Sequence, residues 1–149
     1  MGIRGHLGLL AMCVAMSACG SGSSSQPVSA PAAKPRVFFV EPQNGATVKS
    51  PVHLKFGLEN YQLAAVPQGT VETARPGVGH HHVGIDMDCL SPGATIVKGT
   101  PSWVHFGDGK TEIDMQLTPG QHKLSLALAD DLHKALEGLC QTITVNVAE

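Results

Sequence analysis

Residues 52–59 read VHLKFGLE, and this stretch decides the fold class. Apolar residues occupy every second position in it: Val52, Leu54, Phe56 and Leu58. Side chains of a β-strand point alternately to opposite faces, whereas a helix needs apolar residues three and four positions apart. The stretch therefore predicts a strand with one face in the core and one in solvent.

The same period of two recurs along the chain. Residues 37–40 read VFFV, and the link to residue 52 contains Asn44-Gly45, a strong turn signal. Alternation returns at residues 81–87, 113–117, 124–128 and 143–147. Residues 118–121 (TPGQ) predict a tight hairpin between two of these strands. Residues 131–139 (DLHKALEGL) have helical spacing and predict one or two turns of helix.

Six or seven short strands in about 110 residues are typical of an immunoglobulin-like β-sandwich. We therefore predict an all-β sandwich of about seven strands with one short helical turn near the C-terminus. A small barrel is the competing architecture. A parallel α/β sheet is excluded because the sequence has no crossover helices.

The first 36 residues differ from the rest. Arg4 and the apolar stretch at residues 7–18 (LGLLAMCVAMSA) have the layout of a secretory signal, and this stretch is shorter than the roughly 20 residues of a membrane span. Its end, MSAC, resembles the bacterial lipobox, which predicts a signal peptide over residues 1–18 and a lipid on Cys19. Ordinary signal cleavage, with Cys19 unmodified, is the alternative.

The segment after the lipobox is rich in Gly, Ser, Pro and Ala, so residues 19–36 predict a flexible tether and residues 37–149 the folded domain. Gly20, where other lipoproteins have aspartate, resembles the signal for sorting to the outer membrane. We expect a lipid-anchored domain in a bacterial cell envelope, facing the periplasm, on the outer rather than the inner membrane. The formal net charge of -2 argues against a nucleic-acid partner.

Two cysteines remain in the domain, Cys89 and Cys140. In an oxidising compartment such a pair favours a disulfide over a redox or metal site, and its spacing does not match CxxC.

Three consecutive histidines lie in residues 77–89, GVGHHHVGIDMDC. Strand alternation places His81 with the core residues and puts His80, His82 and Asp86 on the opposite face. Two histidines two positions apart in a strand can reach one ion, and His105 and His133 are further candidates. The predicted metal ligands are thus His80, His82, His105, His133 and Asp86. Imidazole ligands favour Cu(II) or Zn over magnesium or calcium.

The alternative is that these histidines only form hydrogen bonds within the fold. His122, in register with Leu124 and Leu126, is interpreted as a hydrogen-bonded structural residue, and His53 as exposed. No GxSxG, phosphate-binding glycine loop or SxxK motif occurs, so no catalytic residue is predicted and we expect the protein not to be an enzyme.

Several segments together resemble the DUF4399 family of exported bacterial proteins over residues 36–147: the opening VFFVEPQNGATVKSP, GHHHVGIDMDC, WVHFGDG, LTPGQHKL and the final TITVNV. The resemblance implies a small, mostly β periplasmic or lipid-anchored domain of unknown function. His81, His82, His105 and His122 fall on the family's characteristic positions. Before the last strand, where family members have a His- and Pro-rich segment, this chain has LHKALEGLC.

These features lead to three functional expectations. The first is a non-enzymatic, lipid-anchored binding domain whose ligand is a metal ion or a protein partner in the envelope. The second is a structural or adaptor lipoprotein whose histidines serve only the fold. The third, least favoured, is a metal-dependent hydrolase, which would need an open coordination position and a cleft.

Overall fold

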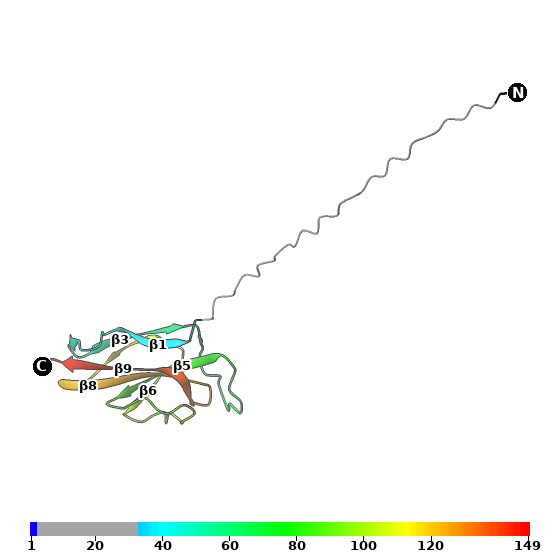
Figure 1. Cartoon of the computed structure of the whole chain (residues 1–149). Coiled ribbons are helices and arrows are strands. Elements are labelled where there is room, and N and C mark those ends of the chain that lie inside the picture. Colours follow the sequence, from blue (N-terminus) through cyan, green and yellow to red (C-terminus); the bar gives the residue numbers. More distant parts are fainter. Residues whose placement is uncertain (3–32) are drawn as a thin grey trace. The chain divides into compact units, whose positions relative to one another are not determined.

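The computed structural model describes residues 1–2 and 33–149 (Figure 1). The predicted signal peptide beyond its first two residues, Cys19 and most of the predicted tether lie outside the described residues. All described strands belong to the unit Ala32–Glu149. Within the described residues, no helix combines the length and the apolar character needed to cross a membrane.

The folded unit is all-β, as the alternation predicts. Its strands are β1 Arg36–Glu41, β2 Thr47–Val48, β3 Val52–Glu59, β4 Gln62–Leu63, β5 Val78–Ile85, β6 Trp103–His105, β7 Glu112–Met115, β8 Gly120–Ala129 and β9 Ala135–Val147. One sheet has the order β1-β3-β7, and the other has the order β2-β9-β8-β5-β4 with β6 also paired to β5. The two sheets form the predicted sandwich (Figure 1).

The core lies between the sheets. In β3, Val52, Leu54 and Phe56 are buried while His53 and Lys55 are exposed, so the alternation in VHLKFGLE is confirmed. One hydrophobic cluster joins buried residues of both sheets, among them Val37, Phe39, Leu54, Phe56, Val83, Leu124, Leu126, Ile143 and Val145. Burial of this apolar surface is the main force that holds the two sheets together.

The helical turn predicted at residues 131–139 is wrong, because no helix occurs among the described residues. The chain makes a turn at residues 131–133, and β9 begins at Ala135 and pairs antiparallel with β8. His133 has a left-handed φ of 61°, which a right-handed helix does not allow. The tertiary pairing of β9 with β8 therefore overrides the local helical spacing.

The hairpin predicted at residues 118–121 is also wrong. β7 pairs with β3 in the three-stranded sheet, whereas β8 pairs with β5 and β9 in the other sheet. The TPGQ segment is therefore a connection from one layer to the other. Alternation identifies strands, but it does not state which strand each one neighbours.

The predicted disulfide between Cys89 and Cys140 is confirmed, with Cα atoms 6.0 Å apart. It ties β9 to the start of the long segment at residues 86–102, which connects β5 to β6. The same segment is held to the start of β9 by backbone hydrogen bonds, from Gly93 N–H to the Ala135 carbonyl and from Ala135 N–H to the Ala94 carbonyl. The connection is thus fixed at its beginning and at its middle.

We expect the double change Cys89→Ser/Cys140→Ser to lower the free energy of unfolding by about 2–4 kcal/mol, because the cross-link restricts the unfolded chain. Urea unfolding under oxidising conditions measures the loss. Reducing the disulfide in the unchanged protein should give the same loss, while the reductant should leave the double variant unaffected. Equal stability of the oxidised protein and the double variant would contradict the prediction.

Candidate metal centre

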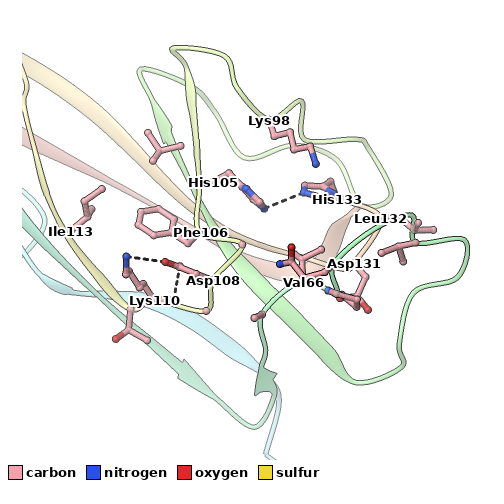
Figure 2. Close-up of a pocket in the computed structure, with 18 of the residues that line it drawn as sticks. Val66, Lys98, His105, Phe106, Asp108, Lys110, Ile113, Asp131, Leu132 and His133 are labelled. Carbon is pink, nitrogen blue, oxygen red and sulfur yellow. Dashed lines mark hydrogen bonds and ion pairs between the residues drawn. The ribbon is translucent and has the colours of Figure 1, made fainter.

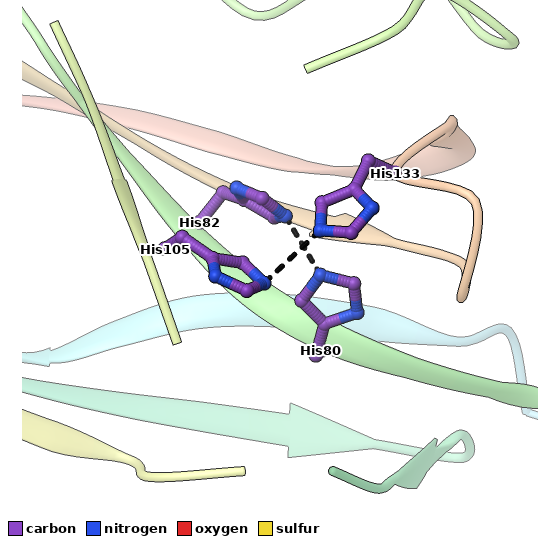
Figure 3. A group of neighbouring side chains, drawn as sticks. All are labelled: His80, His82, His105 and His133. Carbon is purple, nitrogen blue, oxygen red and sulfur yellow. Dashed lines mark hydrogen bonds between the residues drawn. The ribbon is translucent and has the colours of Figure 1, made fainter. Parts of the chain in front are cut away.

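Four histidine side chains from separate parts of the chain converge on one point. They are His80 and His82 of β5, His105 of β6 and His133 of the turn before β9 (Figure 3). Each ring offers one nitrogen, and these four nitrogens lie within 4.8 Å of one another. The four predicted histidine ligands are therefore brought together, and they form a group that can hold a metal ion.

Strand geometry positions the first three rings. Alternation along β5 places His80 and His82 on the same face, away from the core between the sheets. β6 pairs antiparallel with β5 so that His105 lies directly opposite His82. Side chains of directly opposed residues in paired strands are neighbours, so this register brings the third ring beside the first two.

His133 reaches the group from a turn. Its backbone has a φ of 61°, and its N–H donates to the Asp130 carbonyl at 2.9 Å. Its own carbonyl accepts from the N–H of Ile96 at 2.8 Å, which ties the turn to the segment between β5 and β6. Hydrogen bonds on both sides thus hold the fourth ring in place.

The ring nitrogens are already close to the spacing that a metal ion requires. The Nε2 atoms of His80 and His82 are 2.9 Å apart, and those of His105 and His133 are 3.1 Å apart (Figure 3). A tetrahedral zinc ion with Zn–N bonds of about 2.0–2.1 Å separates its nitrogen ligands by about 3.4 Å. Each pair would have to open by a few tenths of an ångström to admit an ion, and nitrogens of different pairs, which lie within 4.8 Å of one another, would have to move closer together.

The four rings are kept neutral by their surroundings. His80 and His82 are fully buried, and burial, followed by the neighbouring histidines, lowers the pKa of His80 to about 3 and that of His82 to about 2. Burial also lowers the pKa of His105 and of His133, and Lys98 adds to both effects, while nearby aspartates oppose them. Neutral imidazole is the form that binds metals, so the site is in the ligand form at neutral pH.

The hydrogen bonds of this group are unusual for structural histidines. Among the described residues, the four side chains hydrogen-bond only within the group, His80 with His82 and His105 with His133. The Nδ1 atoms of His80 and His82 are buried without a partner in the described part of the chain. Buried polar atoms are normally paired, so the arrangement satisfies a hydrogen-bonding role poorly. The facing ring nitrogens are available to an ion, while the Nδ1 atoms of His80 and His82 lack the outer partner that a metal-bound histidine usually has.

The other domain histidines have the carbonyl or carboxylate partners that these four lack, although the Nε2 atom of His81 is also buried without a partner in the described part of the chain. His122 contacts the Asp86 carboxylate at 3.0 Å and the Thr118 carbonyl at 2.9 Å, and His53 contacts Asp114 at 2.8 Å. His81 lies on the core face of β5, beside the ring of Phe56, with its Nδ1 atom 3.3 Å from the Lys110 carbonyl. These positions agree with the structural interpretation of His122, the exposed position of His53 and the core face predicted for His81.

Asp86, predicted as a fifth ligand, does not join the group. Its carboxylate contacts His122 and accepts a hydrogen bond from the backbone N–H of Lys123 at 3.0 Å. A strand rises about 3.3 Å per residue, so Asp86 is too far along the chain from His82 to share an ion with it. Its φ of 55° also ends the strand and its alternation.

One residue that sequence reasoning missed is Gly107, two positions after His105. A Cβ atom at Gly107 would lie 2.3 Å from Cε1 and 2.7 Å from Nε2 of the His105 ring. The ring therefore occupies the space that any other residue's side chain would need. The order His-Phe-Gly at residues 105–107 is the local signal that could have suggested this packing.

A surface pocket lies beside the group, on the side of His105 and His133 (Figure 2). Its wall also includes Lys98, Asp108 and Asp131. His80 and His82 are fully buried, whereas His105 and His133 are only partly buried, so the group faces solvent through the second pair. The pocket therefore opens onto the two partly buried rings of the group, His105 and His133.

Comparison with known proteins identifies a family. A family model described as a domain of unknown function, DUF4399, matches residues 54–148. The match begins at residue 54, so it leaves out β1 and β2. The resemblance seen in the sequence begins at residue 36 and includes both strands. Neither the curated proteins nor the solved structures gave a match.

The lowered histidine pKa values predict a pH dependence of the metal-free protein. The native state keeps His80 and His82 neutral, whereas the unfolded state binds protons below the ordinary histidine pKa of 6.5. The stability from these groups is therefore present above pH 6.5 and falls as the pH drops below it. The raised pKa of His122, due to Thr118 and Asp86 against the opposing effect of burial, contributes with the opposite sign.

Urea unfolding in the presence of a chelator, between pH 7.5 and pH 5.0, checks this dependence. We expect the fall in unfolding free energy to be steeper in the unchanged protein than in His80→Gln/His82→Gln. The matched control is His53→Gln on the other sheet, which should keep the unchanged slope. A slope that is the same in all three proteins would refute the assignment.

Proposed function

The chain belongs to the DUF4399 family, and because the function of that family is unknown, we propose a function from the histidine group itself. The protein is a non-enzymatic domain that binds one transition-metal ion, Cu(II) or Zn(II), in the bacterial cell envelope. The ligands are His80, His82, His105 and His133.

This proposal rests on one observation, the hydrogen-bond partners of the four rings. They converge within 4.8 Å and, among the described residues, hydrogen-bond only within the group. A histidine that serves the fold alone is expected to pair with a carbonyl or a carboxylate, as His122 does. Four neutral imidazoles with no such partner match a metal ligand set.

The chemistry of the ligands narrows the choice of metal. The group contains four nitrogens and neither a carboxylate nor a thiolate. Magnesium and calcium prefer oxygen ligands, whereas imidazole suits zinc and copper. A tetrahedral arrangement would favour Zn(II) and a flattened one Cu(II), and both fit four histidines.

The number of ligands supports a binding role over hydrolysis. Catalytic zinc sites keep a position open for water beside three protein ligands, while closed sites use four. Four histidines would fill the sphere of a tetrahedral ion. We therefore favour a domain that holds or passes on its metal over a metal-dependent hydrolase.

The cellular location is part of the proposal. The lipobox-like ending before Cys19 supports a lipid anchor, and the tether that follows would hold the domain away from the membrane. The Cys89–Cys140 disulfide supports an oxidising compartment such as the periplasm. Gly20 after the anchor cysteine favours the outer membrane.

A second candidate is a structural or adaptor lipoprotein that engages a protein partner in the envelope. One observation favours it: the His80–His82 and His105–His133 hydrogen bonds already hold the four rings together without an ion. In that case the group would stabilise the metal-free fold, and added metal would change nothing.

Thermal unfolding with added metal separates the two candidates. The protein is the oxidised full chain with Cys13→Ser and Cys19→Ser, so that no free thiol competes for the metal. Cu(II) or Zn(II) should raise the melting temperature until one ion per chain is bound, since a ligand of the native state at 100 times its Kd adds about 2.7 kcal/mol. Magnesium should have no effect.

Matched single changes make this test specific. His105→Ala and the double change His80→Ala/His82→Ala should abolish the metal-dependent rise, while His53→Ala should keep it. The metal proposal fails if no metal stabilises the unchanged chain. It fails equally if His105→Ala and His53→Ala respond to metal alike.

Gly107 provides a test that leaves all four ligands in place. Gly107→Ala would push the His105 ring out of the group, because the added Cβ atom would overlap it. We expect metal affinity to fall on the order of 10-fold or more, the effect typical of residues that orient a ligand. Isothermal titration calorimetry in a non-coordinating buffer measures the loss of metal affinity.

The control for Gly107 is the same change in a His105→Ala background, compared by urea unfolding of the metal-free protein because His105→Ala removes metal binding. With the ring gone, Gly107→Ala has nothing to displace and should cause no loss of unfolding free energy. An equal loss of unfolding free energy in both backgrounds would mean that Gly107 acts through the backbone and not through His105.

A further inference from the structure

The metal-loaded site would carry an unusual charge. A divalent ion bound by four neutral imidazoles keeps its full charge of about +2, because none of its ligands is an anion. Sites with thiolates or carboxylates neutralise part of that charge. His80 and His82 are fully buried, so the charge would lie against a region of low dielectric where it is poorly screened.

Three nearby carboxylates, those of Asp131, Asp108 and Asp130, are already engaged. Asp131, which lines the pocket and is 3% exposed, accepts hydrogen bonds from Nε and Nη2 of Arg75, each at 2.8 Å. Asp108 pairs with Lys110 at 2.9 Å. The Asp130 carboxylate accepts the backbone N–H groups of residues 132 and 134. Glu112, the remaining acid of the pocket wall, is exposed at the start of β7.

Lys98 adds a positive charge at the same place. The segment between β5 and β6 carries it, and its side chain extends over His105 and His133 (Figure 2). Lys98 lowers the pKa values of both rings, whereas Asp108 opposes the lowering at His105 and Asp130 and Asp131 oppose it at His133. Among the described residues, no carboxylate forms an ion pair with it. A bound ion and Lys98 would therefore repel each other unless an anion lies between them.

We infer that the pocket beside His105 and His133 is an anion site, in which a small carboxylate or inorganic oxyanion lies between the bound metal ion and the ammonium group of Lys98. The inference rests on the proposed metal function and names a second ligand for that site. Its consequence is coupled binding, in which the anion strengthens metal binding and the metal strengthens anion binding by the same factor.

The test measures metal affinity with and without an anion. Zn(II) is titrated into the oxidised full chain carrying Cys13→Ser and Cys19→Ser, in sodium perchlorate that keeps the ionic strength constant. Acetate is added in one series and sulfate in another. We expect the Zn(II) Kd to fall about five-fold or more with at least one anion, within the usual range of coupling between two sites.

Three variants assign the effect to Lys98. Lys98→Gln should lose most of the gain from the anion, without weaker zinc binding in perchlorate alone, because a repulsive charge has been removed. Lys98→Arg should keep the gain. Lys110→Gln, on the same pocket wall but paired with Asp108, is the matched control and should also keep it. Each variant is compared in the same solutions, so weak binding of the anion to free zinc cancels.

The outcomes separate this inference from the metal function. Zinc binding that neither acetate nor sulfate strengthens would overturn the anion site and leave the metal function standing. An equal gain in Lys98→Gln and the unchanged protein would also overturn it. Absence of zinc binding under all conditions would overturn both. A gain with acetate alone identifies a carboxylate ligand, and a gain with sulfate alone identifies an oxyanion.

Discussion

The pairing of β5 on both of its edges is the constraint on which the rest of the structure depends. β8 pairs along one edge and β6 along the other, and β5 is buried from Val78 to Gly84. Because both faces of β5 are covered, the side chains on each face are buried. One face supplies Val83 and His81 to the core, and the other places two imidazoles where water does not reach them.

The histidine group is completed by parts that would not hold their positions alone. β6 is three residues long, and the His133 turn depends on its bonds to residues 96 and 130. The Cys89–Cys140 bridge and the backbone hydrogen bonds of residues 93–96 fix the segment that surrounds them. A ligand set assembled from three segments is rigid only because this connection is tied down, and rigidity sets how well a site holds its metal.

The group also explains why two kinds of histidine occur in one small domain. His53, His81 and His122 find a carboxylate or a carbonyl, and they form part of the fold. The four rings of the group, among the described residues, find only each other. The charge that a bound ion would bring and the open side of the group are the basis for proposing that metal and anion bind together. Lys98 is the residue whose replacement distinguishes this behaviour from metal binding alone.

The sequence by itself determined β1, β3, β5, β7, β8 and the second half of β9, the all-β class, the disulfide pair and which histidines share a face of β5, because alternation and residue chemistry are local properties. The short strands β2, β4 and β6 were not predicted. It also proposed His105 and His133 as partners, from residue type alone. Only the tertiary structure decided that they reach His80 and His82, that Asp86 does not, and that residues 131–139 form a turn and a strand in place of a helix. Those outcomes depend on the register of β6 against β5 and of β9 against β8, and register is set by contacts between residues distant in the chain.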